Sequence, residues 1–368
     1  MALGFSGSNG GMSINYKQFF VLNLKDNIFY QKNLIPTEVS YFINNICNLK
    51  CIHCYVGYCD SSNALSIQRW KDVFSELIDS GARTFGNVGK EPLLSWHKTR
   101  DLLHYFKTKR SEIPTLRFGF VTNGILLDEH KIIELESIKP DYIDISLDGN
   151  RKTHDWIRGT CGYDKLMNNL SILSKYELSK KIFISLTLNK INASSVAEVI
   201  ETVYNLGIKN ILISPYVTLN IHDNLFISND EIIFETQKLI NGELVNFTNY
   251  KGLNIYFKND FTTTRDLMEE MADRNIINKH ELLIDNYGVI FNKYSINNNN
   301  IYFNYLPWDT SYIQAIRISH NGYVSNCYDM FFENYPERAI GNVREKSIRE
   351  ILENRNVFKK EYAGCDFP

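Results

Sequence analysis

Short strand-like runs alternate with helix-like stretches along the first two-thirds of the chain, and this alternation is the strongest constraint on its fold. Residues 66–80, for example, carry apolar side chains at helical spacing and are followed by Gly81, a common helix stop. Repeated β/α units predict parallel strands joined by right-handed crossovers. The predicted strands are Glu38–Ile43, Thr84–Val88, Arg117–Thr122, Tyr142–Leu147, Phe183–Leu188 and Asn210–Pro215.

Six strands are fewer than the eight of a complete TIM barrel. We therefore expect an α/β fold built as a partial (β/α)6 TIM-type barrel, with an open doubly wound sheet as the alternative. In either arrangement, functional side chains gather at the carboxyl ends of the strands. The expected segments are a Gly-rich vector remnant or disordered tail (1–11), an N-terminal segment (12–38), the partial barrel (39–219), a helical insertion or cap followed by short strands (220–304) and a small α+β module (305–368).

The composition argues against several classes of function. The 368 residues carry a formal net charge of −2, so nothing indicates a nucleic-acid or membrane surface. No apolar run approaches the roughly 20 residues of a membrane span, and no secretory signal precedes the first strand. We therefore expect a cytoplasmic protein whose seven cysteines stay reduced, and clustered reduced thiols indicate metal binding.

Three cysteines follow the first predicted strand at its carboxyl end. Cys47, Cys51 and Cys54 have the spacing C-x3-C-x2-C. Structural zinc sites commonly take four ligands from paired Cys or His knuckles. Here His53 is poorly placed as a fourth ligand because it adjoins Cys54. Three thiolates suit a [4Fe–4S] cluster that leaves one iron open to a small molecule, and a zinc loop is the alternative.

The loop sequence "CNLKCIHC" (47–54) resembles the defining loop of the radical S-adenosylmethionine (radical SAM) superfamily. Further similarities lie at successive strand ends. "GNVGKEPLL" (86–94) resembles the superfamily's Gly-Gly-Glu-Pro element and departs from it at Lys90. "VTNG" (121–124) and "DISLDG" (144–149) end the next two strands, as they do in members of the superfamily.

Two later segments resemble one subfamily, whose members carry SPASM or Twitch extensions at the C-terminus. They are "THDWIRG" (153–159) and "GYVSNCYDM" (322–330). A turn at Asn321-Gly322, between alternating runs, predicts a β-hairpin at the start of the extension. The resemblance therefore implies a small SPASM/Twitch-like α+β module after the barrel.

The remaining cysteines leave an auxiliary iron–sulfur cluster undecided. Cys327 and Cys365 are its candidate ligands. The SPASM spacing fits Gly341 but not Lys346, which stands where a cysteine is usual. We therefore favour an extension without a complete auxiliary cluster. The alternatives are completion of the cluster by Cys161 and another ligand, or a truncated chain.

Polar side chains alternate with apolar ones on two neighbouring predicted strands. Buried parallel strands normally carry apolar residues on both faces, so a polar face indicates an interior that holds a ligand. These polar residues are Asp144, Ser146 and Asp148 on one strand and Ser185, Thr187 and Asn189 on the next. Ser146, Ser185 and Asn189 suit the hydroxyl and carboxylate groups of a cosubstrate; satisfied polar groups inside a barrel are the alternative.

The resemblance implies that the three loop cysteines bind the cluster and that S-adenosylmethionine binds its open iron. Reductive cleavage of the sulfonium then releases a 5′-deoxyadenosyl radical, with an electron donor such as flavodoxin or ferredoxin. Arg158 would pair with the methionine carboxylate, and Cys161 would return a hydrogen atom in an epimerisation. The other residues implied to contact the cosubstrate are Tyr55, Gly89, Glu91, Asn123, Ser146, Asp148, Ser185 and Asn189.

Two classes of substrate fit this resemblance. The favoured reaction is maturation of a ribosomally made peptide by cross-linking, thioether formation or epimerisation. The alternative is dehydrogenation, dehydration or epimerisation of a sugar or aminocyclitol. A third hypothesis, a non-catalytic iron–sulfur or zinc protein, does not explain the motifs at the strand ends.

Overall fold

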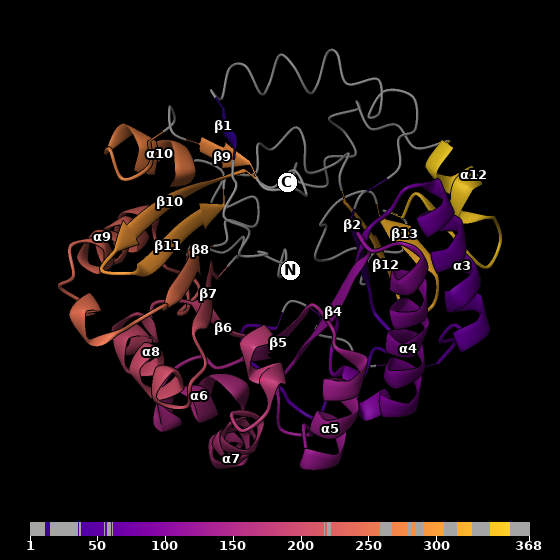
Figure 1. Ribbon diagram of the computed structural model, residues 1–368, viewed down its shortest axis with the longest axis horizontal. Helices are drawn as coiled ribbons and strands as arrows, with labels where there is room; N and C mark the ends of the chain where they lie inside the picture. Colours follow the sequence, from indigo (N-terminus) through magenta and orange to yellow (C-terminus); the bar gives the residue numbers. More distant parts are fainter. Residues whose placement is uncertain are drawn as a thin grey trace.

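A curved β-sheet forms the framework of the molecule, and the helices cover its outer side (Figure 1). The computed structural model describes residues 12–14, 36, 38–54, 56, 60, 62–216, 218, 222–257, 267–278, 282–284, 290–304, 315–325 and 339–353. Within these residues, fourteen strands join in the order β1-β9-β10-β11-β8-β7-β6-β5-β4-β3-β2-β12-β13-β14. The order does not return to its first strand, so the barrel is partial, as predicted.

The six strands predicted from the alternation are all present. Each pairs in parallel with the next in sequence, which is the arrangement that repeated β/α units dictate. They are β2 (Glu38–Tyr41), β3 (Thr84–Asn87), β4 (Arg117–Thr122), β5 (Tyr142–Ser146), β6 (Ile182–Leu188) and β7 (Asn210–Pro215).

The crossover helices begin and end where the sequence supplies caps. Ser66 accepts a hydrogen bond from the backbone N–H of Arg69 at the start of the first, and Gly81 ends it in the left-handed region. One short helix, α6, was not predicted. The helices are α3 (Ile67–Ser80), α4 (Trp96–Glu112), α5 (Glu129–Ile138), α6 (Arg151–Arg158), α7 (Tyr163–Leu173) and α8 (Val196–Asn205), with short 3-10 turns at Pro92–Ser95, Glu177–Lys181 and Ala193–Ser195.

Residues 220–304 extend the barrel wall as well as contributing helices. β8 (Asn254–Phe257) lies parallel to β7, and β11 (Asn299–Asn304) lies parallel to β8. The expected helices and short strands of this region therefore include strands that are continuous with the barrel sheet. Its other elements, with the N-terminal strand that pairs with it, are α9 (Asn229–Ile240), α10 (Leu267–Asp273), β9 (Leu282–Ile284), β10 (Ile290–Ile296), the 3-10 turn Phe247–Asn249 and β1 (Met12–Ile14).

An asparagine ladder ties these added strands to the barrel. Asn210, Asn254 and Asn300 are register partners on β7, β8 and β11. The Asn254 amide donates to Asn210 Oδ1 at 3.1 Å, and the Asn300 amide donates to Asn254 Oδ1 at 2.9 Å. Side-chain amides that pair across strands in this way satisfy polar groups that would be costly to bury alone.

The C-terminal elements continue the sheet at its other end. β12 (Ala315–Ile318) lies parallel to β2, and β13 (Tyr323–Ser325) pairs antiparallel with β12. The predicted hairpin at Asn321-Gly322 is confirmed, and Gly322 has a φ of +97°. The remaining elements are β14 (Gly341–Asn342) and α12 (Ile348–Glu353).

Aromatic rings fill the layer between the sheet and the first two helices. Phe74 of α3 is fully buried, with its ring centroid 4.9 Å from that of Tyr41 on β2 and 5.1 Å from that of Phe106 on α4. Phe85 and Phe118, from the next two strands, complete this cluster. Burial of such large apolar surfaces is the main force that holds the helices against the strands. No helix in the described ranges has both the length and the apolar character needed to cross a membrane.

Side chains on the inner face of β5 and β6 change from aromatic to polar along each strand. Tyr142 and Phe183 lie near the amino ends, and Tyr142 packs so close to Gly119 that a β-carbon there would lie 2.7 Å from its ring. Toward the carboxyl ends come Ser146 and Ser185, which are register partners. The buried inner cluster consists of Tyr142, Phe183, Leu212 and Tyr256, with Tyr302 packed against it.

Asp144 lies between these two zones and is a buried carboxyl group. It is only 1% exposed, and its Oδ1 has no hydrogen-bond partner among the described residues. Its register partners on the flanking strands are Val121 and Phe183, which offer no hydrogen-bonding side chain. Burial therefore raises the pKa of Asp144 well above its usual value.

We expect Phe74→Ala to lower the free energy of unfolding by about 3–5 kcal/mol, because it empties the centre of the aromatic layer. The control is Phe234→Ala, because Phe234 on α9 is 59% exposed and its loss should cost less than about 0.5 kcal/mol. Urea denaturation followed by circular dichroism measures both. Equal losses in the two variants would contradict this account of the core.

We expect Asp144→Asn to become more stable relative to the wild type as the pH rises. A carboxyl with a raised pKa in the folded state contributes stability below its unfolded pKa of about 3.9, and this contribution is lost as the pH rises through the folded pKa. The Asn variant has no such loss. Melting temperatures measured at intervals from pH 5 to pH 9 test this, and a difference that stays constant would contradict it.

Candidate active site

The three loop cysteines lie between β2 and α3, at the carboxyl ends of the strands. Each sulfur has a hydrogen-bonding neighbour: Leu49 N–H donates to Cys47 Sγ at 3.4 Å, and Arg158 Nη1 donates to Cys51 Sγ at 3.7 Å. The thiol of Cys54 donates to the carbonyl of Val56 at 3.4 Å. The loop is therefore held in shape by its own backbone and by a cation from α6.

The backbone N–H of Cys54 donates to the carbonyl of Cys51 at 3.1 Å, so these two cysteines lie on one turn of the loop, and burial affects the ionisation of Cys47 and Cys51. Burial, followed by the charges of Glu91, Cys51 and Cys54, raises the pKa of Cys47 to about 11. Burial also raises the pKa of Cys51, although Arg158 opposes this. The free thiols of Cys47 and Cys51 are accordingly protonated at neutral pH, and metal binding must displace these protons.

The arrangement of the thiols fits an iron–sulfur cluster better than a single ion. Among the described residues, no three His, Cys, Asp or Glu side chains converge as they would around one metal ion. A cubane cluster does not need such convergence, because each thiolate binds a different iron. Three thiols, close but not convergent, therefore fit a [4Fe–4S] cluster with one iron free for another ligand.

Glu91 joins the cluster loop to two neighbouring strand ends. Its buried carboxylate accepts hydrogen bonds from Leu93 N–H at 2.9 Å, Thr122 Oγ1 at 2.8 Å and Asn123 N–H at 2.8 Å. Its own backbone N–H donates to the carbonyl of Ile46, just before the first cysteine. Burial raises the pKa of Glu91 to about 7, although the N–H donors of Asn123 and Leu93 and the Thr122 hydroxyl lower it. The predicted cosubstrate residue thus has a structural role.

Asn123 and Gly89 complete this junction. The Asn123 amide donates to Asn48 Oδ1 at 2.8 Å, inside the cluster loop. Gly89 lies against the ring of Phe42, where a β-carbon would lie 2.0 Å from the nearest ring carbon, so only glycine fits. Lys90, the departure from the superfamily motif, adopts a φ of +51°, and its ammonium donates to the carbonyl of Val56 beyond the last loop cysteine.

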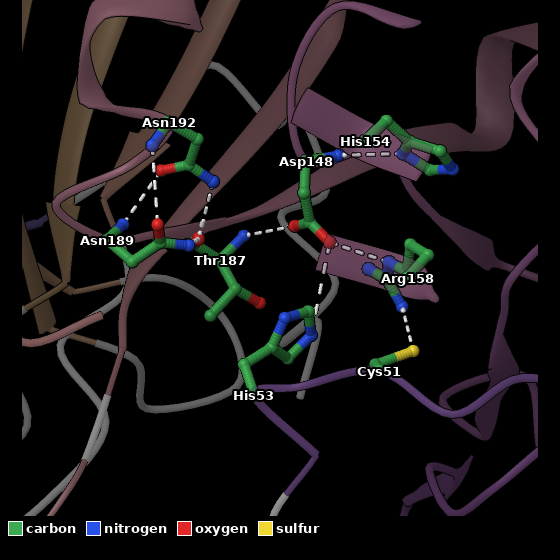
Figure 2. Close-up of polar contacts among 8 residues, drawn as sticks. All are labelled: Cys51, His53, Asp148, His154, Arg158, Thr187, Asn189 and Asn192. Carbon is green, nitrogen blue, oxygen red and sulfur yellow. Dashed lines mark hydrogen bonds and ion pairs between the residues drawn. The ribbon is translucent and has the colours of Figure 1, made fainter. Parts of the chain in front are cut away.

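A buried ion pair lies at the end of β5 (Figure 2). Arg158 Nε lies 2.6 Å from Asp148 Oδ2, and Nη1 of the same guanidinium reaches Cys51. The other oxygen of Asp148 accepts a hydrogen bond from Thr187 N–H on β6 at 2.9 Å. Burial raises the pKa of Asp148, but Arg158, the Thr187 N–H and the two nearby histidines together outweigh burial and hold the pKa of Asp148 below its usual value. Arg158 therefore connects Cys51 of the loop to two strand ends.

Two neutral histidines flank this pair. His53, within the cluster loop, has its Nε2 3.9 Å from Asp148 Oδ2. His154 Nδ1 accepts a hydrogen bond from the backbone N–H of Asp148 at 3.2 Å. Burial, together with the charge of Arg158, lowers the pKa of each histidine to about 4, although Asp148 acts in the opposite direction. Both rings are therefore uncharged at neutral pH, and Arg158 is the cation that faces Asp148.

The predicted polar residues of β5 and β6 fall into two groups. Ser146 and Ser185 are half-buried register partners, and neither hydroxyl makes a hydrogen bond within the described ranges. Both remain open to a ligand. Asn189, in contrast, donates to Thr187 O at 2.9 Å and accepts from Ile191 N–H at 3.0 Å, so its amide stabilises a turn.

Of the predicted residues that the structure describes, Cys161 is not brought into this site. Tyr55, Cys327 and Cys365 lie outside the described residues. Cys161 lies on an exposed turn between α6 and α7.

The analysis of sequence missed His53 and Thr187 as partners of Asp148. Asn192, which accepts from Asn189 N–H, was also missed. The contacts of His53 and Thr187 with Asp148 join separate parts of the chain, so spacing gave no signal for them, whereas Asn192 bonds to a residue only three positions away.

Comparison with known proteins identifies two regions of the chain. Residues 41–214 match the radical SAM superfamily, and residues 312–366 match an iron–sulfur cluster-binding domain, SPASM. The second match indicates an auxiliary iron–sulfur cluster, against our expectation of an extension without a complete one.

Curated relatives match this chain over less than half of its length. The chain is 30% identical to Fe-coproporphyrin III synthase of Methanosarcina barkeri over 158 residues. This aligned region covers 42% of this chain and 38% of that protein. Over 177 residues the chain is 27% identical to the sporulation killing factor maturation protein SkfB of Bacillus subtilis, with 47% and 41% covered. The chain thus spans about two fifths of the length of these relatives.

A solved structure shares the fold over nearly the whole chain. Streptococcus suis SuiB bound to its precursor peptide SuiA superposes with a TM-score of 0.67 and 16% identity, covering 97% of this chain and 74% of that one. At this identity the likeness concerns the fold alone. The chain therefore contains a radical SAM domain at residues 41–214, followed by a SPASM-type iron–sulfur cluster-binding domain at residues 312–366.

Proposed function

We propose that this protein modifies a ribosomally made peptide by radical chemistry, through a cross-link, a thioether or an epimerisation. The radical SAM domain gives the chain a [4Fe–4S] cluster and S-adenosylmethionine as cofactors. When bound, they supply a 5′-deoxyadenosyl radical, which abstracts a hydrogen atom from the substrate. The observation that carries the proposal is the loop of three thiols beside the buried Asp148–Arg158 pair, at the carboxyl ends of the barrel strands.

The residues of the chain prepare the site in three ways. Cys47, Cys51 and Cys54 would hold the cluster. The hydroxyls of Ser146 and Ser185 face the interior without partners among the described residues, so they are ready to bind polar groups of the cosubstrate. The ion pair and the Glu91 junction fix the loops beforehand, which reduces the ordering that must occur on binding.

The choice of a peptide substrate rests on the relatives. SkfB is described as a maturation protein of a killing factor, and SuiB was solved with a precursor peptide. The observation that favours a small molecule is the 30% identity to Fe-coproporphyrin III synthase. Mass spectrometry of the protein incubated with short peptides encoded beside its gene separates the two. Loss of two hydrogens from a peptide, or deuterium uptake from heavy water, supports the peptide reaction.

We expect the variant in which Cys47, Cys51 and Cys54 are all Ala to form no 5′-deoxyadenosine after anaerobic reconstitution with iron and sulfide. The wild type should form it in the presence of dithionite, because only the intact loop supplies three thiolates. The Cys161→Ala variant is the control, since Cys161 lies on an exposed turn. This variant should still cleave S-adenosylmethionine, even if it no longer epimerises the substrate. Iron that persists in the triple variant reports the auxiliary cluster.

We expect Arg158→Ala to lower the free energy of unfolding of the metal-free protein by about 3–5 kcal/mol, because it leaves Asp148 buried without its cation. Arg151→Ala is a matched control on the same helix. Arg151 forms an exposed ion pair with Asp164, whose loss should cost less than about 1 kcal/mol.

Arg158→Lys keeps the charge but not the forked geometry of the guanidinium. Its loss in free energy of unfolding should therefore lie between those of Arg158→Ala and Arg151→Ala. Chemical denaturation of the metal-free proteins measures all three. If Arg158→Ala cost no more than Arg151→Ala, the proposed preorganising role of the pair would be wrong.

A further inference from the structure

Helix α6 has two faces of opposite character. Arg158 and His154 lie on the buried face, and Arg158 contacts Cys51. Lys152 and Trp156 are four residues apart and therefore share the opposite face, where Trp156 is 53% exposed. The helix thus has solvent on one side and the surroundings of Cys51 on the other.

The cluster loop lies against the end of this helix. The backbone N–H of Ile52 donates to the carbonyl of Ile157 at 2.9 Å. Gly159, the C-cap of α6, packs so closely on Lys50 that a β-carbon there would lie 2.8 Å from the Lys50 carbonyl oxygen. Ile52, directly after the ligand Cys51, is 46% exposed.

We call four exposed residues on α6 and on the loop packed against it the outer strip: Lys50, Ile52, Lys152 and Trp156. The two lysines make no ion pair in the part of the chain that the structure describes, whereas their neighbour Arg151 is paired with Asp164. The nearby carboxylate of Asp155 accepts a hydrogen bond from Tyr163 N–H at 2.9 Å. Single exposed apolar residues are common, but two beside unpaired cations and a cluster ligand make a distinct patch.

We infer that the outer strip is the docking surface for an acidic one-electron carrier protein of the flavodoxin or ferredoxin class. The inference rests on the proposed function, whose sulfonium cleavage needs one electron. The carrier's reduced flavin or iron–sulfur centre loses that electron and the cluster of the chain gains it, with no bond or proton transferred. The strip favours such a partner because unpaired cations attract an acidic surface, while Trp156 and Ile52 supply apolar contact.

The location of the strip also separates the two partners of the reaction. The open hydroxyls of Ser146 and Ser185 lie on the inner face of the sheet, while Trp156 lies on the exposed face of a helix outside it. A carrier seated on the strip would therefore leave the inner face free for cosubstrate and substrate.

The test compares reductants in the reconstituted enzyme. The rate of 5′-deoxyadenosine formation is measured against the concentration of a reduced bacterial flavodoxin, at low and at physiological ionic strength. Lys152→Glu should raise the flavodoxin concentration for half-maximal rate by about tenfold at low salt, with a smaller effect at higher salt. Trp156→Ala should raise it at both salt concentrations. With dithionite, an anion, or reduced methyl viologen, a cation, both variants should match the wild type.

Two remote variants are the controls. Lys251→Glu reverses an exposed charge just before β8, at the amino end of that strand, and Phe234→Ala removes an exposed aromatic ring from α9. Neither should change the response to flavodoxin. Direct binding of oxidised flavodoxin, measured by calorimetry on the reconstituted proteins, gives a second readout that does not depend on activity. This binding should be weaker in Lys152→Glu and Trp156→Ala and unchanged in the two controls.

Several outcomes would overturn the inference. One is an unchanged flavodoxin response and unchanged binding in both strip variants. Another is an equal loss of rate with methyl viologen, which would place the defect at the cluster. A third is loss of binding to anionic lipid vesicles in Lys152→Glu with normal flavodoxin binding, which would assign the strip to a membrane surface. If the wild type forms no 5′-deoxyadenosine with any reductant, the proposed function fails, and calorimetry still decides whether the strip binds the carrier.

Discussion

The buried pair of Asp148 and Arg158 is the interaction on which the site depends. Isolated charges are expensive to bury, so each of these residues needs the other in order to stay inside the protein. Their positions bring together the end of β5, the end of α6 and, through Thr187, the carboxyl end of β6. The contact with Cys51 then carries this rigidity into the cluster loop.

Glu91 plays the matching part on the other side of the loop. It accepts three hydrogen bonds and links the ends of β3 and β4 to the residues that precede Cys47. Residues that the superfamily motifs connect with the cosubstrate thus also build the scaffold around the cluster. A substitution at Glu91 or Arg158 would therefore change loop geometry, and measurements on the metal-free protein isolate this effect from any change in ligand binding.

Local patterns predicted the barrel well because strand and helix periodicity depend on near neighbours. All six strands and the hairpin at Asn321-Gly322 were found in this way. The loop cysteines were predicted as a group because they are close in sequence. The alternation on β5 and β6 also placed Ser146 and Ser185 on one face, where the structure confirms that they are neighbours.

Very short elements and features that depend on distant partners were not predicted. Helix α6 has caps at Asn150 and Gly159 but is only eight residues long, so its helical period was too brief to detect. The pairing of β11 with β8 joins residues about forty-five positions apart, and no local pattern indicates that alignment. Arg158 was expected to pair with the cosubstrate. Its contacts with Asp148 and Cys51 arise only when a strand, a helix and a loop meet.

The aromatic cluster on the inner face has a consequence for the approach of any substrate. Tyr142 and Phe183 occupy the amino-terminal part of β5 and β6, and Tyr256 and Tyr302 stack beside them at a centroid distance of 4.7 Å. These rings leave the carboxyl-terminal part of β5 and β6, with the hydroxyls of Ser146 and Ser185, as the polar part of the inner face. A substrate would therefore meet these hydroxyls from the carboxyl ends of the strands, with the aromatic rings beneath it.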